Sequence, residues 1–403
     1  MEFIQISSLD YLRLVSFAVV LLILSGVLAG RSPANFFLFP WISLFLFLSY
    51  HLYASSLMEI GFRLGLLLSL TAALGIFSRF AFINRSLPFA FIFFQDFTSI
   101  SSWFSGFRPG PGFSYLAFRM SDAFYNIFKH KDYDSKNKKR IKDIHDTGIK
   151  RNHSTEENDK NIFYKKLNAF ILQTFAFTAL PAGPVILSGQ FRINKSPFRI
   201  KDRFYRRGVF LFCIGILKLM LLLPLWTGHF EKGLLFPVDF SSRSFYNIFS
   251  YGFYQYIRIF LDFSGYTDIA VGLSALLGFK IRHNFFRPYL SVSLSEFWRR
   301  WHITLASWIR RHVYIPMGGS RRGKWTQGRN LIFCMVLIGI WHGTGLHFFA
   351  WGLLHGIFLF IEKAFLLDLY ENFERKIKFS GKISGWIVTQ MFVTLTWAIF
   401  FIK

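Results

Sequence analysis

The sequence has few cysteines, few acidic residues and little charge of any kind. Its 403 residues contain only two cysteines, and no CxxC pair or cysteine–histidine spacing typical of a zinc site accompanies them. We therefore expect neither a disulfide framework nor a metal centre. Charged residues make up 17% of the chain, which is less than a soluble domain of this length usually carries.

Apolar residues take the place of the missing charge. They account for 53% of the chain, and 54 residues are phenylalanine. Apolar stretches long enough to cross a hydrocarbon core of about 30 Å recur along the sequence. We predict an all-α, polytopic membrane protein with about 9–11 apolar helical segments, some of them re-entrant or interfacial. The segments fall at 12–30, 36–54, 62–78, 87–104, 112–128, 167–190, 208–228, 245–277, 298–316, 331–361 and 383–402.

The net charge of +25 predicts how the segments are oriented. Basic residues collect in loops that stay in the cytoplasm, and no nucleic-acid-binding motif accompanies them. We expect the polar stretch 129–166 and the basic stretch 192–207 to be cytoplasmic, with the N-terminus outside. The N-terminus carries Glu2 and Asp10 before its first apolar run and lacks a basic n-region, so we interpret that run as a retained helix rather than a cleaved signal. Three parts follow: membrane helices at 1–128, a charged cytoplasmic loop at 129–166 and a membrane core at 167–403.

Two apolar segments are not expected to form single membrane-spanning helices. Segment 167–190 has cytoplasmic flanks and contains the helix-interrupting string LPAGP, which favours a re-entrant hairpin, unless one loop is assigned to the wrong side. Segment 298–316 alternates cations with Trp, Ile and Tyr, which is typical of an amphipathic helix at the interface. Together they predict the cytoplasmic floor of a central cavity.

Ionisable side chains inside the apolar segments form three clusters. Each such side chain costs about 2.5–3.5 kcal/mol to insert, so it needs a partner or a function. The clusters are Asp262 and Asp268 with Tyr266 between them, Arg299 and Arg300 with His302, and His342 with His347 and His355. We expect the aspartates to pair with Arg258, Arg299 or Arg300 and to belong to the scaffold of the cavity. The arginine pair is either a membrane anchor or a site for an anionic donor.

The histidines allow a catalytic or a structural interpretation. His347 and His355 are interpreted as satisfied interior residues. His342 stands between Trp341 and Gly343, where a small residue lets a substrate approach, and imidazole moves protons near neutral pH. His342 and His302 are each either catalytic or a hydrogen-bond partner between helices.

Four ordered strings between about 251 and 356 point to a family. They are DFSGYTDIAVGLSALLGFKIRHNFFRPY, FWRRWHITLASW, VYIPMGG and IWHG. They resemble the membrane-bound O-acyltransferase family, particularly its bacterial branch of alginate O-acetylase and the D-alanyl transfer protein of teichoic acid modification. Fainter likeness extends to GFSYLAFRMSDAFYNIF and LPAGPVILSGQF.

The resemblance implies that His342 matches the catalytic histidine and His302 a second, partly conserved position. It implies a tunnel with a thioester donor, acyl-CoA or an acyl carrier, entering from the cytoplasm, and no bound cofactor. The acceptor is a hydroxyl of an envelope glycan or a partner protein beyond a bacterial inner membrane, and the acyl group is expected to be acetyl. Expected donor-binding residues are Arg299, Arg300, Arg321, Arg322 and Lys324. The expected cavity scaffold is Asp262, Tyr266, Asp268, Asn284, Trp301 and Trp341.

The sequence departs from the family pattern in three places. Arg310 is followed by Arg311 and His312, where the family commonly has an aspartate after the arginine. The loop at 129–166 is unusually long and charged. Relatives usually continue through further helices beyond the point where this chain stops, so we expect either a shortened member of the family or a truncated gene product. A different class, a polytopic transporter or flippase-like protein, also has broken helices and intramembrane ionisable residues, but we find no internal repeat of the kind transporters use.

Overall fold

The computed structural model describes the membrane core most completely. The described residues are 115, 118, 119, 122, 123, 173, 176, 179, 183–188, 192–193, 203–231, 244–343, 345–366 and 380–402. The apolar segments expected between 12 and 104, and the loop at 129–166, lie outside these residues.

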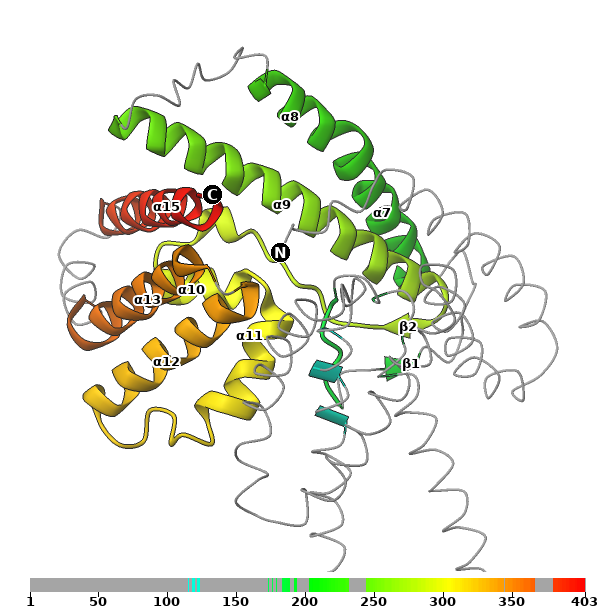
Figure 1. Ribbon diagram of the computed structural model, residues 1–403. Coiled ribbons are helices and arrows are strands. Elements are labelled where there is room, and N and C mark those ends of the chain that lie inside the picture. The colour runs from blue at the N-terminus through cyan, green and yellow to red at the C-terminus, as the bar shows by residue number, and fades with distance from the viewer. Residues whose placement is uncertain are drawn as a thin grey trace, which may run out of the picture.

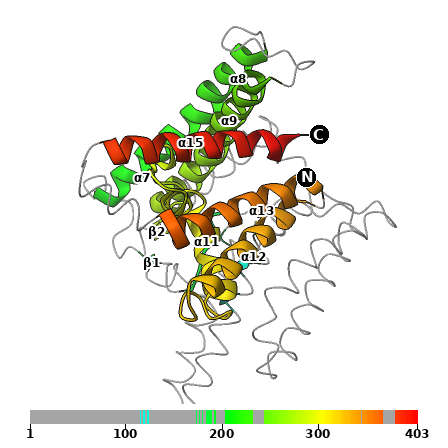
Figure 2. The same cartoon turned by 90° about the vertical axis from the view of Figure 1, so that its left-hand side faces the viewer.

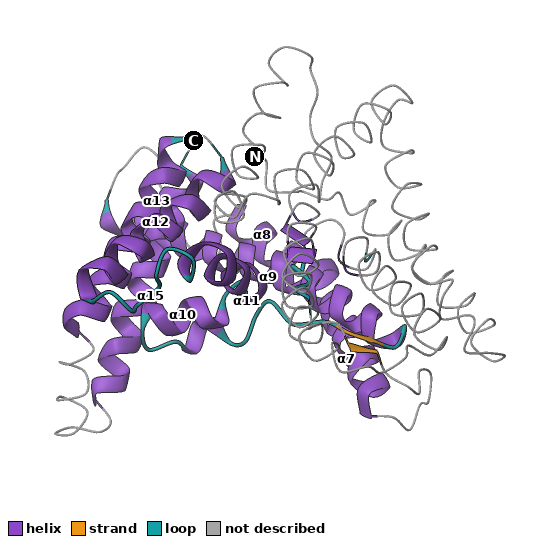
Figure 3. Cartoon of the chain, turned by 90° about the horizontal axis from the view of Figure 1, so that it is seen from below, coloured by secondary structure: helices purple, strands orange, loops and turns teal. Residues whose placement is uncertain are grey.

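Four helical stretches are long and apolar enough to span a membrane, counting only the described residues. They are Arg203–Phe230, Phe245–Leu276, Leu346–Phe365 and Lys382–Phe401. The sequence predicted 208–228, 245–277 and 383–402 for three of them, so these bounds agree to within a few residues. The chain is a multi-pass, helical membrane protein, as the sequence predicted. Figure 3 shows how little strand the described part contains: the two-residue strands β1 (Arg192–Ile193) and β2 (Phe279–Lys280) pair antiparallel.

The first spanning stretch and the second lie against each other. α7 (Arg203–Leu217) continues through a π-helical turn, η2 (Lys218–Leu222), into α8 (Leu223–Glu231), and α9 (Phe245–Leu276) runs beside them (Figure 1). Glycines allow this close approach. A Cβ on Gly215 would stand 2.6 Å from the carbonyl oxygen of Gly265, and one on Gly272 would stand 2.6 Å from the nitrogen of Phe212. Small residues at such contacts let backbones meet where the lipid provides no hydrophobic drive.

The predicted segment 331–361 is two helices rather than one. α12 (Lys324–His342) ends at Gly343, whose φ is 157°, and α13 (Leu346–Ile361) returns along it (Figure 2). A Cβ on Gly339 would meet the carbonyl oxygen of Phe348 at 2.3 Å. Apolar composition continues through the turn, so hydropathy alone does not reveal the break. The consequence is that His342 lies at a helix end, not in the middle of a helix as expected.

The predicted amphipathic segment 298–316 is also interrupted. α10 (Leu294–Arg300) and α11 (Ile303–Ile309) are separated at Trp301 and His302, and a π-helical turn, η4 (Arg310–Tyr314), follows. Ser293 caps α10 by accepting a hydrogen bond from the Glu296 nitrogen at 3.1 Å. The remaining described elements are the 3₁₀ turn η3 (Pro288–Leu290), the π-helical turn η5 (Glu362–Leu366) and α15 (Ser380–Phe401).

An aromatic core joins these elements. Its largest buried side chains include Trp301, Trp308, Trp341, Trp351 and Trp397. Residues 183–188, from the segment expected to be re-entrant, are non-helical and pack into the same region with Val185 and Leu187 buried. Irregular backbone at membrane depth is tolerated where protein groups satisfy it. Here the Val185 nitrogen donates to Thr304 Oγ1 at 2.9 Å.

Candidate functional site

His342 is the last residue of α12 and is half-buried among aromatic rings. Its imidazole lies 4.6 Å from the Trp341 ring and 4.9 Å from that of Phe400, measured between ring centroids. Trp351 of α13 meets it edge to face at 5.8 Å. The turn at Gly343 therefore places a histidine where three helices meet.

His302 occupies the break between α10 and α11 and is buried. Its φ is 44°, a left-handed conformation that is uncommon for a residue with a side chain. Such strain persists only where the surroundings enforce it, and it clusters at functional sites. The backbone is held on both sides, because the Ile303 nitrogen donates to the Asn284 carbonyl oxygen at 2.9 Å and Ala306 donates to the His302 carbonyl oxygen at 3.0 Å.

The His302 side chain has one hydrogen-bond partner. Nε2 lies 3.3 Å from the phenol oxygen of Tyr115, whereas Nδ1 is buried and makes no hydrogen bond to the described residues. This segment lies outside the spanning helices, and burial lowers the pKa of the His302 imidazole to about 3. Charge on His342 lowers this pKa further and the backbone of His302 opposes the shift. The ring is therefore neutral at physiological pH.

Trp341 connects the two histidines. Its ring lies 6.4 Å from His302 and 4.6 Å from His342, again between centroids. The structure thus brings together the two histidines that the sequence singled out, one from the break before α11 and one from the end of α12. The tunnel that the resemblance implied stays a prediction.

Asn284 and Trp301 are buried residues that pack close to the His302 backbone. Asn284 is fully buried, and its Oδ1 accepts hydrogen bonds from Thr304 Oγ1 at 2.5 Å and from the Thr304 nitrogen at 3.3 Å. Trp301 stacks on Phe297 with centroids 5.4 Å apart. Both residues are buried, and their expected place in the scaffold of a cavity stays a prediction.

The ion-pair partner that we predicted for Asp268 was wrong. The sequence led us to expect an arginine, but Asp268 Oδ2 lies 2.6 Å from Lys218 Nζ and Oδ1 lies 3.0 Å from His283 Nε2. Lys218 also donates to Ser264 Oγ at 3.0 Å. The π-helical turn at 218–222 brings the lysine onto the face that meets α9, and this rotation leaves no trace in the sequence pattern.

Asp262 and Tyr266 lie on α9 near this pair. Arg258 lies four residues before Asp262 on α9, and its guanidinium carbon lies 5.3 Å from the centre of the Phe401 ring. The expected pairing of Asp262 with an arginine stays a prediction. Tyr266 is buried at 2% exposure and packs with Leu219 and Ile269.

The cations expected to bind a donor are mostly exposed. Arg299 lies on α10, Arg321 and Arg322 lie in the turn before α12, and Lys324 begins α12, where its Nζ donates to the Ala364 carbonyl oxygen at 3.3 Å. Arg300 differs, because its guanidinium donates to Glu296 Oε1 at 2.5 Å and lies 5.7 Å from the Phe286 ring. Arg300 is therefore partly committed to an internal ion pair.

The other two histidines have structural surroundings. His355 is buried, Nδ1 accepts a hydrogen bond from Trp298 Nε1 at 3.3 Å, and Nε2 lies 3.0 Å from Thr396 Oγ1. Its two nitrogens are both satisfied, as in an interior histidine. His347 packs on Phe348 at 4.1 Å between centroids. In the described part of the chain, no three His, Cys, Asp or Glu side chains group as metal ligands would.

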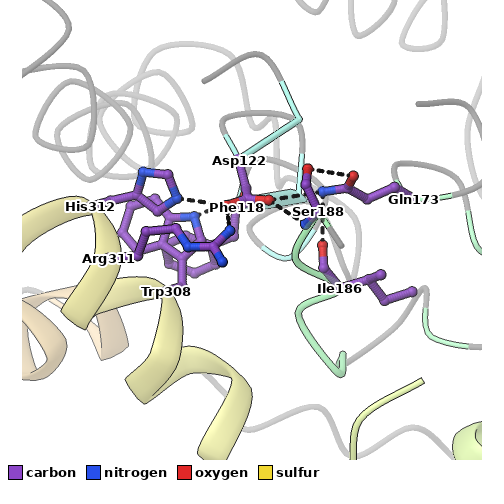
Figure 4. Close-up of polar contacts among 8 residues, drawn as sticks. All are labelled: Phe118, Asp122, Gln173, Ile186, Ser188, Trp308, Arg311 and His312. Atoms are coloured by element: carbon purple, nitrogen blue, oxygen red, sulfur yellow. Dashed lines mark hydrogen bonds and ion pairs between the residues drawn. The ribbon is translucent and has the colours of Figure 1, made fainter. Parts of the chain in front are cut away.

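Asp122 is the centre of a buried polar network that the sequence analysis missed (Figure 4). Its carboxylate accepts hydrogen bonds from Arg311 Nη1 and His312 Nε2, both at 2.9 Å. It also accepts from the Ser188 nitrogen at 2.6 Å and from Gln173 Nε2 at 3.1 Å. Arg311 and His312, which follow Arg310 where the family commonly has an aspartate, thus both bind a carboxylate from a distant part of the chain.

The rule that singled out the other candidate residues also applies to Tyr115, Asp122 and Lys218. Each is a polar or ionisable residue within a predicted apolar segment, and such residues need partners. Their partners lie 46 to 190 positions away, so only the fold reveals what each one binds.

Comparison with known proteins identifies the family. The model of the membrane-bound O-acyltransferase family matches residues 34–402. The chain belongs to this family. It is 35% identical over 230 residues to a peptidoglycan O-acetyltransferase of Helicobacter pylori, covering 56% of this chain and 42% of that protein.

Two further relatives of this chain carry different names. A probable alginate O-acetylase of Pseudomonas fluorescens is 42% identical over 143 residues, which cover 36% of this chain and 28% of the relative. A teichoic acid D-alanyltransferase of Bacillus subtilis is 32% identical over 135 residues, 32% of each chain. The match therefore spans less than half the length of these relatives.

Proposed function

We propose that this chain carries the membrane core of an O-acyltransferase that moves an acyl group, expected to be acetyl, from a thioester to a hydroxyl. The observation that supports this is the pair His302 and His342, both of which lie against the Trp341 ring in the aromatic core. Family membership supports the reaction class, and the names of the relatives support a glycan or teichoic acid acceptor.

In the proposed reaction His342 is the general base. It takes the proton of the acceptor hydroxyl as the hydroxyl oxygen attacks the thioester carbonyl carbon. The carbon–sulfur bond then breaks, and the imidazolium returns the proton to the leaving thiolate, so the products are an ester and a thiol. A positioned base contributes about 10²–10⁴-fold to such a rate. The aromatic surroundings exclude water that would hydrolyse the thioester.

His302 would bind the thioester carbonyl in this scheme. Its buried Nδ1 makes no hydrogen bond to the described residues, and a donor aimed at a developing oxyanion is usually among the largest contributions to catalysis. The exposed cations Arg321 and Arg322 would attract the phosphates of acyl-CoA or an acidic carrier protein. The proposal requires that turn to lie on the cytoplasmic side of an inner membrane, with the acceptor on the far side.

His342→Ala tests the proposal in proteoliposomes supplied with radiolabelled acetyl-CoA and glycan fragments of peptidoglycan or alginate. We expect transfer to fall at least about 100-fold while the protein remains folded. The exposed His229 gives a matched control, since His229→Ala is expected to keep wild-type transfer. Full activity in the His342 variant would refute the mechanism, and uptake of a labelled solute without transfer would favour the transporter alternative.

Charge reversal tests the donor site separately. Arg321→Glu with Arg322→Glu is expected to raise KM for acetyl-CoA and to weaken its salt dependence, because exposed charges act over roughly 10 Å at 0.1 M salt. The exposed pair Arg206 and Arg207 on α7 provides the control, reversed in the same way. An unchanged KM and an unchanged salt dependence in the first variant would remove these arginines from the donor site.

A further inference from the structure

Tyr115 and His302 form a buried polar contact between segments that are 187 residues apart in the sequence. The phenol oxygen lies 3.3 Å from His302 Nε2, and the two rings are nearly parallel, with an angle of 18° between their planes. Both side chains are buried, at 6% and 4% exposure. Water is therefore not available to replace either partner.

The position of Tyr115 is fixed from several sides. Trp308 Nε1 donates to the Phe118 carbonyl oxygen at 3.0 Å, which ties the helical turn after Tyr115 to α11. The Trp341 ring meets the Tyr115 ring edge to face at 5.9 Å. Gly183 lies beneath the ring, where a Cβ would stand only 2.8 Å from Tyr115 Cε1. The phenol is therefore held against the imidazole by the core.

The protons at this contact can be assigned by counting unsatisfied groups. If the phenol O–H donates to Nε2, the neutral ring carries its proton on Nδ1, and only that N–H lacks a partner among the described residues. If Nε2–H donated to the phenol oxygen instead, both the phenol hydrogen and the Nδ1 lone pair would be buried without partners. Buried groups without partners are costly, so the first arrangement is favoured.

We propose that Tyr115 is a positioning residue for the acyl transfer: its phenol donates to His302 Nε2, keeps the ring proton on Nδ1, and so makes Nδ1–H the donor to the thioester carbonyl oxygen. This inference rests on the proposed function. The donor strengthens as negative charge develops on that oxygen, and the left-handed backbone of His302 holds the ring in place for it. Tyr115 itself touches neither substrate.

Tyr115→Phe tests this assignment, because it removes only the phenol oxygen. In proteoliposomes with radiolabelled acetyl-CoA and peptidoglycan fragments, we expect kcat to fall about tenfold to a hundredfold with KM for acetyl-CoA unchanged. Tyr256→Phe is the matched control, since Tyr256 is buried to a similar degree and its phenol donates to Gln390 Oε1 at 3.3 Å, away from His302. That control is expected to keep the wild-type kcat.

A double-mutant comparison shows whether Tyr115 acts through His302. Tyr115→Phe is expected to have no additional effect on a His302→Gln protein. A wild-type kcat in Tyr115→Phe, an equal loss in the His302→Gln background, or a loss that only follows a lower melting temperature would each overturn the proposal. His342→Ala is measured in parallel. If it keeps full activity, the proposed function is wrong. If His342→Ala is inactive but Tyr115→Phe is fully active, only the present inference is wrong.

Discussion

Lys218 and Asp268 form an ion pair between two membrane-spanning helical stretches, with Nζ 2.6 Å from Oδ2. Asp268 is almost fully buried, with 5% of its side chain exposed, and His283 approaches its second oxygen at 3.0 Å. A charge buried at this depth is tolerated because it is paired. The pair therefore fixes α9 against the turn that separates α7 from α8.

Asp268→Asn is expected to destabilise the protein by about 3–5 kcal/mol, because it leaves the Lys218 ammonium without its counter-charge. Adding Lys218→Met to the same chain is expected to recover most of the loss. Unfolding by sodium dodecyl sulfate, followed by circular dichroism, measures both. Equal stability of wild type and the single variant would show that the pair contributes nothing.

Asp122→Asn is expected to cost a similar amount, about 3–5 kcal/mol, because Arg311 and His312 would face an amide in place of a buried carboxylate. The matched control is Glu296→Gln, whose partner Arg300 is partly exposed, and it is expected to cost about 1 kcal/mol or less. Thermal melting in detergent compares the two. Similar melting temperatures would mean that the buried network does not hold residues 183–188 in place.

Gly352→Ala is expected to destabilise the hairpin of α12 and α13 by about 1–3 kcal/mol. A Cβ at this position would stand 2.5 Å from the Met335 carbonyl oxygen, which cannot move without disturbing α12. Gly228→Ala on α8 meets no atom within 4 Å, so it is expected to be neutral or to stabilise by up to about 1 kcal/mol. Melting temperatures that change in the same direction for both variants would contradict this contrast.

Glu362→Gln is expected to lower the free energy of unfolding by about 1–3 kcal/mol. The substitution replaces one carboxylate oxygen, an acceptor, with an amide NH₂ group, which is a donor. The fully buried Glu362 carboxylate accepts hydrogen bonds from the Leu294 nitrogen at 2.6 Å and the Ser295 nitrogen at 3.0 Å. Lys363→Gln, at the next position, is expected to leave the melting temperature unchanged. An equal fall in melting temperature in both variants would mean that local charge matters, rather than the hydrogen bonds that Glu362 accepts from the first turn of α10.

The spanning helices were predictable because their signal is continuous. Phe245–Leu276 was predicted almost to the residue, since hydropathy summed over a long window does not depend on any single contact. The breaks at His302 and Gly343 were not predicted, because a single residue with positive φ changes no composition. Apolar pattern therefore locates the helices but not the turns that orient the histidines.

The candidate site was predictable only in part. His302 and His342 stood out as imidazoles in apolar surroundings, and the structure places both against Trp341. Tyr115 is a polar residue within a predicted apolar segment, but its partner is 187 residues away, so the sequence did not show what it binds. Asp268 stood out, but its lysine partner depends on a local change in helix geometry.

The described part of the chain contains three π-helical turns, η2, η4 and η5. Each turn carries side chains that bind a distant segment. They are Lys218 in η2, Arg311 and His312 in η4, and Glu362 in η5. A π turn accommodates one residue more than an α-helical turn, and one α-helical residue corresponds to a rotation of about 100°. Deleting one residue within such a turn would thus restore a regular α-helical turn and redirect the side chain that binds the distant segment, while the helix downstream keeps its face. Homologous sequences that lack the extra residue will align with a gap of one position inside a helix, and that gap marks a lost long-range bond.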